Sequence, residues 1–171
     1  TPALSSPAMR QEEWLALESI YKSGAARSIG LSHYCSQHID DVLEVATVAP
    51  TVNQVEYHPW LDQTPMLEAL AGQGMALTAY VPLAKGKAAQ DGTLARIGAA
   101  HGVSGATACL AWLLARGAIA IPKTANPARL AENAAALDVT LTGAEIDEIT
   151  ALAIPDGRLV SGVNGIAPDW D

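Results

Sequence analysis

Short apolar runs alternate with segments of helical periodicity along most of this chain, and no other feature constrains its fold as strongly. Four runs have the length of buried strands and cover residues 27–32, 51–57, 76–81 and 118–121. The segments between them repeat apolar residues at intervals of three and four, which is typical of helices. Strands that alternate with helices usually form a parallel sheet with right-handed crossovers. The sequence therefore predicts an α/β fold of parallel (β/α) units.

Capping residues locate several of the helices. Gly24 ends an opening helix, Asn126 is a good N-cap with Pro127 at the first helical position, and Thr142 and Glu145 have the spacing of a capping box. The helix that Asn126 begins comes within a few residues of the fourth apolar run. A strand end and a helix start are therefore expected to lie next to each other.

The length and composition fit one domain. The chain has 171 residues, of which half are hydrophobic, so it can bury a sizeable core. We predict a single domain over 1–171, with an irregular start at 1–10 and a loop-rich tail at 155–171. About four strands make half of an eight-stranded TIM barrel, so the fold is a half-barrel or a fragment of a (β/α)8 barrel. No GxGxxG follows the first run, which weakens a Rossmann interpretation; on pattern alone, an open flavodoxin-like sheet stays possible.

Charge and cysteine content exclude several classes of function. A net charge of −8 argues against nonspecific nucleic-acid binding, which needs a basic surface. No apolar run has the length of a membrane span, and the first residues contain no hydrophobic signal core. Cys35 and Cys109 lack metal-ligand spacing, and no histidine pair has it either. We expect reduced thiols, no metal site and a cytoplasmic location.

The helix start near residue 126 has the features of an anion site. Its free N–H groups and positive dipole end favour negative charge. Lys123 comes just before the helix and Arg129 lies in its first turn. Two cations at one helix start predict a bound phosphate.

Polar and aromatic residues follow the other three apolar runs. In parallel-strand barrels the functional residues gather at the carboxyl ends of the strands. The residues at these ends are Ser32 and His33, Asn53 and Gln54, Tyr80, and Lys123 with Thr124. Amides, hydroxyls and an aromatic ring at one end and cations at the other would suit a dinucleotide.

These residues lie in segments that resemble the C-terminal part of an aldo-keto reductase. The matching segments are 28–32, 52–59, 79–83, 121–133 and 167–171, in family order, and the likeness runs from about Trp14 to the last residue. The resemblance implies that the chain carries the NADP(H)-binding half of a carbonyl reductase, an oxidoreductase acting on small aldehydes or ketones. The alternative is a noncatalytic NADP-binding or dimerising half-barrel module.

The resemblance also assigns roles to single residues. Ser32 and Gln54 would hydrogen-bond the nicotinamide carboxamide, Tyr80 would stack on the nicotinamide, and Leu83 would lie beside the pyrophosphate. The other assigned residues are Lys123, Thr124 and Arg129 for the 2′-phosphate, Glu132 and Asn133 for the adenine, and Trp60 for the substrate pocket.

The sequence departs from the family at three of the matching positions. His33 stands where an asparagine is common and could still donate to the carboxamide. Val81 replaces a common serine, and Ala84 a common glycine. These changes make the affinity for the cofactor less certain without excluding it.

The catalytic tyrosine, lysine, aspartate and histidine of the family lie on its first four strand units, which have no counterpart here. No residue of this chain is therefore predicted to be catalytic. Tyr57 and His58 belong to the second-half signature, and we expect Glu56 to form a buried pair with a neighbouring cation. Three explanations follow: a fragment whose partner half was lost or lies elsewhere and with which it would pair, a natural half-barrel that dimerises, or a folded chain without activity.

Overall fold

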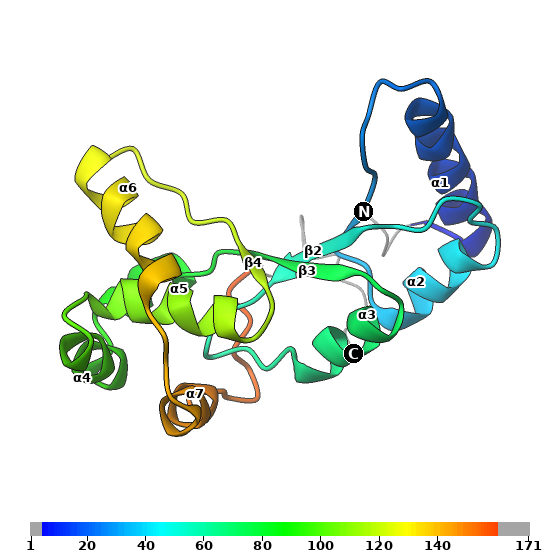
Figure 1. The fold of residues 1–171 in the computed structure, drawn as a ribbon. Helices are drawn as coiled ribbons and strands as arrows, with labels where there is room; N and C mark the ends of the chain where they lie inside the picture. The colour runs from blue at the N-terminus through cyan, green and yellow to red at the C-terminus, as the bar shows by residue number, and fades with distance from the viewer. Residues whose placement is uncertain (1–4, 161–171) are drawn as a thin grey trace. The chain divides into compact units, whose positions relative to one another are not determined.

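Four parallel strands form one sheet in a computed structural model that describes residues 5–160. The strand order is β1-β2-β3-β4, and Figure 1 labels β2, β3 and β4. Their bounds are β1 (Leu31–Ser32), β2 (Val52–Glu56), β3 (Ala76–Tyr80) and β4 (Ile119–Ala120). Leu31 lies opposite Asn53, and Thr78 opposite Ile119. The predicted parallel α/β fold is confirmed, although each strand is shorter than its apolar run.

Helices separate and flank these strands. The α-helices are α1 (Pro7–Lys22), α2 (Ser36–Leu43), α3 (Thr64–Gly72), α4 (Gly92–Ala100), α5 (Gly105–Ala115), α6 (Pro127–Ala134) and α7 (Gly143–Thr150), and the 3-10 helices are η2 (Ala84–Ala89) and η3 (Ala135–Asp138). Among the described helices none is long and apolar enough alone to cross a membrane; α4 and α5 meet that test only as a pair, bent by 84°.

The helix caps agree with the sequence, with one correction at the start of the chain. The Asn126 side chain accepts a hydrogen bond from the N–H of Ala128 at 3.0 Å, and Thr142 forms its capping box. The predicted irregular start at 1–10 is too long, because α1 begins at Pro7. Ser6 caps this helix by accepting from the Met9 N–H at 3.3 Å, and proline is well suited to the first helical position.

The chain divides into two compact units, so the predicted single domain stays a prediction. Within the described residues, unit 1 comprises 5–55, 64–77 and 160, and unit 2 comprises 56–63 and 78–159. Of the predicted tail, residues 155–160 form turns and irregular chain, and the rest lies outside the described residues. Each unit buries one free cysteine, Cys35 in unit 1 and Cys109 in unit 2.

In unit 1, α1 packs against α2 (Figure 1). The buried carboxylate of Glu18 stabilises this unit. Glu18 accepts hydrogen bonds from the Lys22 ammonium group at 2.8 Å, the Thr47 hydroxyl at 2.5 Å and the Val48 N–H at 2.8 Å. These bonds lower the pKa of Glu18 to about 2, and the bond from Lys22 has the largest effect. Glu18 therefore ties α1 to the loop before β2. Elsewhere in unit 1, a Cβ at Gly30 would lie 2.6 Å from Val52 Cγ2, so only glycine fits beside that strand.

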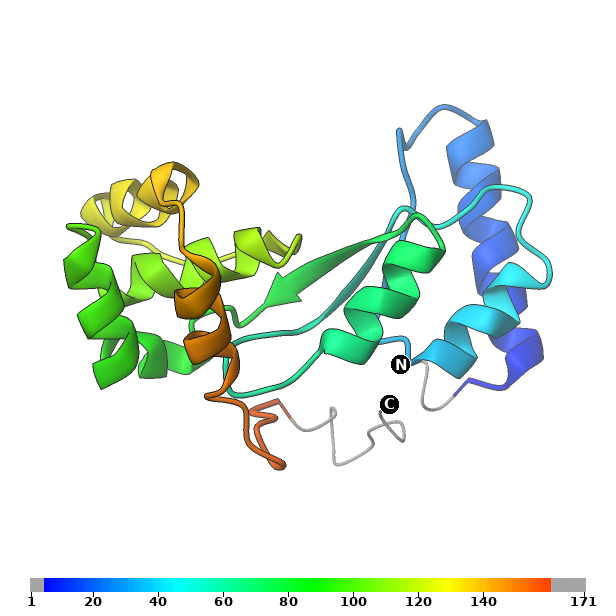
Figure 2. The same ribbon diagram turned by 60° about the horizontal axis from the view of Figure 1, so that its bottom comes forward.

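Unit 2 is built around α5, which packs against α4, α6 and α7 (Figure 2) and is buried along most of its length. Trp112 packs against the ring of Tyr57 with centroids 5.2 Å apart, and its indole N–H donates to Thr150 at 3.1 Å. A Cβ at Gly98 would lie 2.7 Å from the Ser104 carbonyl oxygen, which shows how closely α4 approaches the start of α5. This close packing forms the scaffold for the loops that follow β3 and β4.

Candidate functional site

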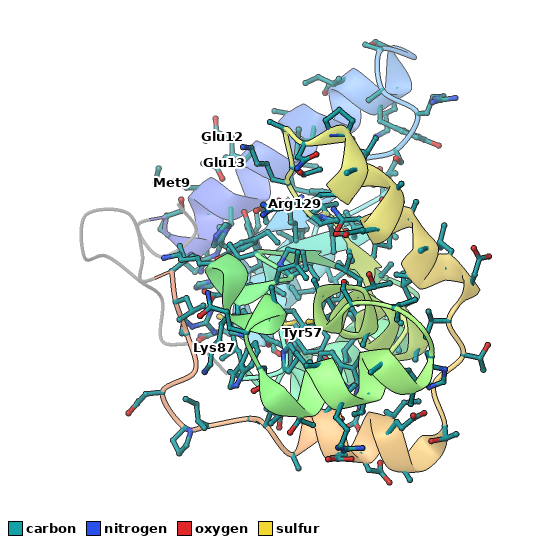
Figure 3. The ribbon with its side chains drawn as sticks, turned by 90° about the vertical axis from the view of Figure 1, so that its left-hand side faces the viewer. Met9, Glu12, Glu13, Tyr57, Lys87 and Arg129 are labelled. Carbon is teal, nitrogen blue, oxygen red and sulfur yellow. The ribbon has the colours of Figure 1, made fainter. Side chains whose placement is uncertain are left out.

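A cavity of about 400 Å³ in unit 2 has a basic lining. Its residues are Val81, Pro82, Leu83, Lys85, Gly86, Pro122, Lys123 and Arg129. Three of these residues are cations and none is acidic. Arg129 projects from α6 (Figure 3). The lining therefore attracts an anion, as the sequence predicts for Lys123 and Arg129.

The loop after β3 reaches this cavity through an unusual backbone. Val81, Ala84 and Lys85 have φ of 51°, 48° and 54°, and Gly86 has 96°. The first three carry side chains in the left-handed region, which is costly, and Val81 is also β-branched. Strained backbone of this kind is held by its surroundings and is often found at binding sites. The loop bends back on itself and presents both Leu83 and Lys85 to the cavity.

The residues predicted beside Arg129 have different surroundings. The hydroxyl of Thr124 accepts from the Asn126 N–H at 3.1 Å and so helps to shape the helix start. Asn133 lines a second cavity of about 220 Å³, whose other residues are Leu110, Leu114, Ala120, Pro122, Ala134, Ala136 and Leu137. Glu132 is exposed on α6. Both cavities share Pro122, so they adjoin at that residue.

Tyr80 is the last residue of β3 and is half-buried. Burial first, and then the charge of Glu56, raise the pKa of Tyr80 against the opposing charge of Arg158, and the result is about 12. The phenol is therefore neutral at physiological pH. A neutral, half-exposed ring at a strand end can stack on a flat ligand.

Ser32, His33 and Gln54 come together in unit 1. Ser32 and Gln54 are register partners, and the His33 N–H donates to the Gln54 carbonyl at 2.9 Å. His33 has φ of 63°, a conformation that asparagine and histidine adopt more readily than most residues. This explains how histidine can stand where asparagine is common. The Ser32 hydroxyl lies 2.9 Å from His33 Nδ1.

Asn53 supports this turn and was not assigned a role from the sequence. It is fully buried, and its side-chain amide donates to the Tyr34 carbonyl at 2.8 Å while accepting from the Tyr34 N–H at 3.4 Å. In the sequence, only its position next to Gln54 indicated a role for Asn53. The joining of this group in unit 1 with the basic cavity in unit 2 into one groove stays a prediction.

Trp60 is buried, with 5% of its surface exposed. The ammonium group of Lys87 lies 4.2 Å from the centre of its ring, a cation–π contact. Trp60 does not line either cavity within residues 5–160. Its predicted part in a substrate pocket stays a prediction.

Glu56 forms the predicted buried pair. Its carboxylate lies 3.0 Å from His58 Nε2 and 4.0 Å from an Arg158 nitrogen, and it accepts from the Leu159 N–H at 2.6 Å. Sequence reasoning expected a cation without identifying Arg158. It also missed Lys85, whose ammonium group donates to the Leu159 carbonyl at 2.8 Å. Through these contacts with Glu56 and Lys85, Arg158 and Leu159 lie close to the end of β2 and to the loop after β3.

Comparison with known proteins identifies the family of the chain. The family model described as "Aldo/keto reductase family" matches residues 2–154. The chain is 38% identical to aldo/keto reductase slr0942 of Synechocystis sp., covering 92% of this chain and 51% of that protein. It is also 38% identical to glyoxal reductase of Bacillus subtilis, over 83% of this chain and 51% of that protein.

Solved structures show the same likeness. A putative 2,5-diketo-D-gluconic acid reductase B superimposes with a TM-score of 0.90 at 39% identity, over 95% of this chain and 58% of its own. A mutant of Gox0644 in complex with NADPH gives 0.82 at 33% identity, over 89% and 55%. These neighbours are (β/α)8 barrels, and the chain spans about half the length of the curated relatives it matches. The chain belongs to the aldo/keto reductase family.

Proposed function

We propose that this chain supplies the NADP(H)-binding half of a carbonyl reductase that acts on small aldehydes or ketones. The observation that carries the proposal is the basic cavity, where Lys123 and Arg129 meet beside the N-terminus of α6 with no acidic residue in the lining. A helix N-terminus with two cations suits the dianionic 2′-phosphate that distinguishes NADPH from NADH. The cytoplasmic location stays a prediction.

The remaining residues would act by binding and orientation. Ser32, His33 and Gln54 would hydrogen-bond the carboxamide, the neutral ring of Tyr80 would stack on the nicotinamide, and Leu83 would face the pyrophosphate. Thr124, Glu132 and Asn133 would complete the adenosine end, and Trp60 would border the substrate. The cofactor, when bound, supplies the hydride for carbonyl reduction.

The proton donor of the family has no counterpart in this chain, so turnover would require a complementary half. That half would be the first four (β/α) units of the barrel, whereas in the alternative function the chain binds NADP or pairs with a second copy of itself without turnover. One experiment separates the two functions: NADPH fluorescence titration beside aldehyde-dependent NADPH oxidation, on the chain alone and with the complementary half added. Turnover only with that half supports the reductase. Binding without turnover in either case supports the noncatalytic module, and no binding contradicts both.

Arg129→Ala tests the phosphate assignment. A charge-assisted hydrogen bond contributes about 1.5–3 kcal/mol, so we expect the Kd for NADPH to rise about tenfold or more. The Kd for NADH should change little, since NADH has no 2′-phosphate. Arg96→Ala is a matched control because Arg96 is an exposed arginine that pairs with Glu148 on α7, away from the cavity lining. Equal losses for both cofactors would contradict the assignment.

A further inference from the structure

Residues 157–159, which we call the strap, are held against the rest of unit 2 at three points. Gly157 lies so close to Trp60 that a Cβ there would be 1.7 Å from the Trp60 carbonyl oxygen. The Leu159 N–H donates to Glu56 at 2.6 Å, and the Leu159 carbonyl accepts from Lys85 at 2.8 Å. Both polar atoms of one peptide residue are therefore held by side chains of opposite charge.

The two side chains that hold Leu159 differ in freedom. Glu56 is fully buried at the end of β2, between His58 and Arg158, and cannot move away without giving up these buried partners. Lys85 is exposed and has a long flexible stem. It can release the strap at little cost.

Lys85 also lines the basic cavity together with Lys123 and Arg129. A phosphate oxygen is charged, whereas the Leu159 carbonyl is neutral. Hydrogen bonds between two charged groups are roughly twice as strong as neutral ones. An anion in the cavity would therefore be the stronger partner for the ammonium group.

We propose that a phosphorylated ligand in the basic cavity and the strap compete for Lys85, so that ligand binding loosens the strap. This inference rests on the proposed function, because it needs the cavity to take a phosphate. Coupling between two binding events is reciprocal. If ligand binding loosens the strap, loosening the strap must also tighten ligand binding. A lysine with a purely structural role would not produce this coupling.

The direct test follows hydrogen exchange of the Leu159 amide with and without saturating 2′,5′-ADP. In the wild-type chain the ligand should speed this exchange at least about fivefold, the low end of typical coupling between sites. In Lys85→Met exchange should be fast without ligand and should not respond to it. Lys87→Met is the matched control: Lys87 lies over Trp60 and does not line the cavity, so this variant should respond like the wild type.

The reciprocal test uses Gly157→Ala, which displaces the strap without changing charge. By the same reciprocity we expect its Kd for 2′,5′-ADP to fall at least about fivefold, and this gain to vanish in the double variant with Lys85→Met. If Gly157→Ala is poorly folded, Glu56→Gln takes its place in the double-mutant cycle with Lys85→Met. This variant loosens the strap by weakening the bond from the Leu159 N–H.

The outcomes separate this inference from the proposed function. Binding of 2′,5′-ADP by the wild type with unchanged or slower Leu159 exchange would overturn the competition alone. A gain in affinity from Gly157→Ala that persists without Lys85 would also overturn it. Failure of the wild type to bind 2′,5′-ADP would overturn both.

Discussion

Replacing Gly157 with alanine should destabilise unit 2 measurably. The new Cβ would lie 1.7 Å from the Trp60 carbonyl oxygen, whereas real Cβ atoms essentially never come within 3.0 Å of such an atom. The two backbones must therefore separate by at least about 1.3 Å, the difference between these distances. The same Trp60 oxygen accepts from the Ile154 N–H at 3.2 Å, and that bond would be lost as well.

The expected loss follows from the two hydrogen bonds that this movement breaks. The Ile154 bond to Trp60 is neutral and contributes about 0.5–1.5 kcal/mol, and the Leu159 bond to the Glu56 carboxylate contributes about 1.5–3 kcal/mol. Together they predict a free energy of unfolding lower by about 2–4.5 kcal/mol. Gly157 has no positive φ, so the effect comes from the steric clash and not from an altered backbone preference.

Urea denaturation followed by tryptophan fluorescence measures this loss, provided that the m-value is unchanged. Gly92→Ala is the matched control, because a Cβ there would meet no atom within 4 Å. The control should be as stable as the wild type or slightly more stable. A Gly157→Ala chain with wild-type stability and a protected Leu159 amide would refute the steric reasoning.

Two further substitutions test the packing of each unit. Glu18→Gln should lower the free energy of unfolding at pH 7. Because the pKa of Glu18 is lowered from 4.5 to about 2, the stabilisation is present above pH 4.5 and disappears as the pH falls through 2. A deficit of the same size at pH 7 and pH 2 in denaturation curves would contradict this. Gly98→Ala should cost about 1–3 kcal/mol by overpacking α4 against Ser104, and a calorimetric midpoint equal to that of Gly92→Ala would exclude the clash.

The features that the sequence could predict are local. The caps at Asn126 and Thr142 depend on residues two or three positions away, and both are confirmed. Lys123 and Arg129 line the same cavity, and both come from one short segment of the sequence. In each case the partners lie close together along the chain, so their spacing alone carries the information.

The missed features join distant parts of the chain. Lys85 meets a residue 74 positions away, and Glu56 meets the same Leu159 across 103 positions. No periodicity or spacing marks such a contact. The positive φ of Val81 was equally hidden, because a β-branched residue normally avoids that conformation and only the surrounding packing can impose it.

The two buried thiols give each unit a chemical reporter of its own opening. Cys35 lies in unit 1 and Cys109 in unit 2, and the chain contains no other cysteine. Burial raises the pKa of Cys109, so its thiol resists alkylation until unit 2 opens. The rates at which the two sites are alkylated would therefore follow the two units separately in a single sample. Equal rates would mark one cooperative opening, and unequal rates would show which unit opens first.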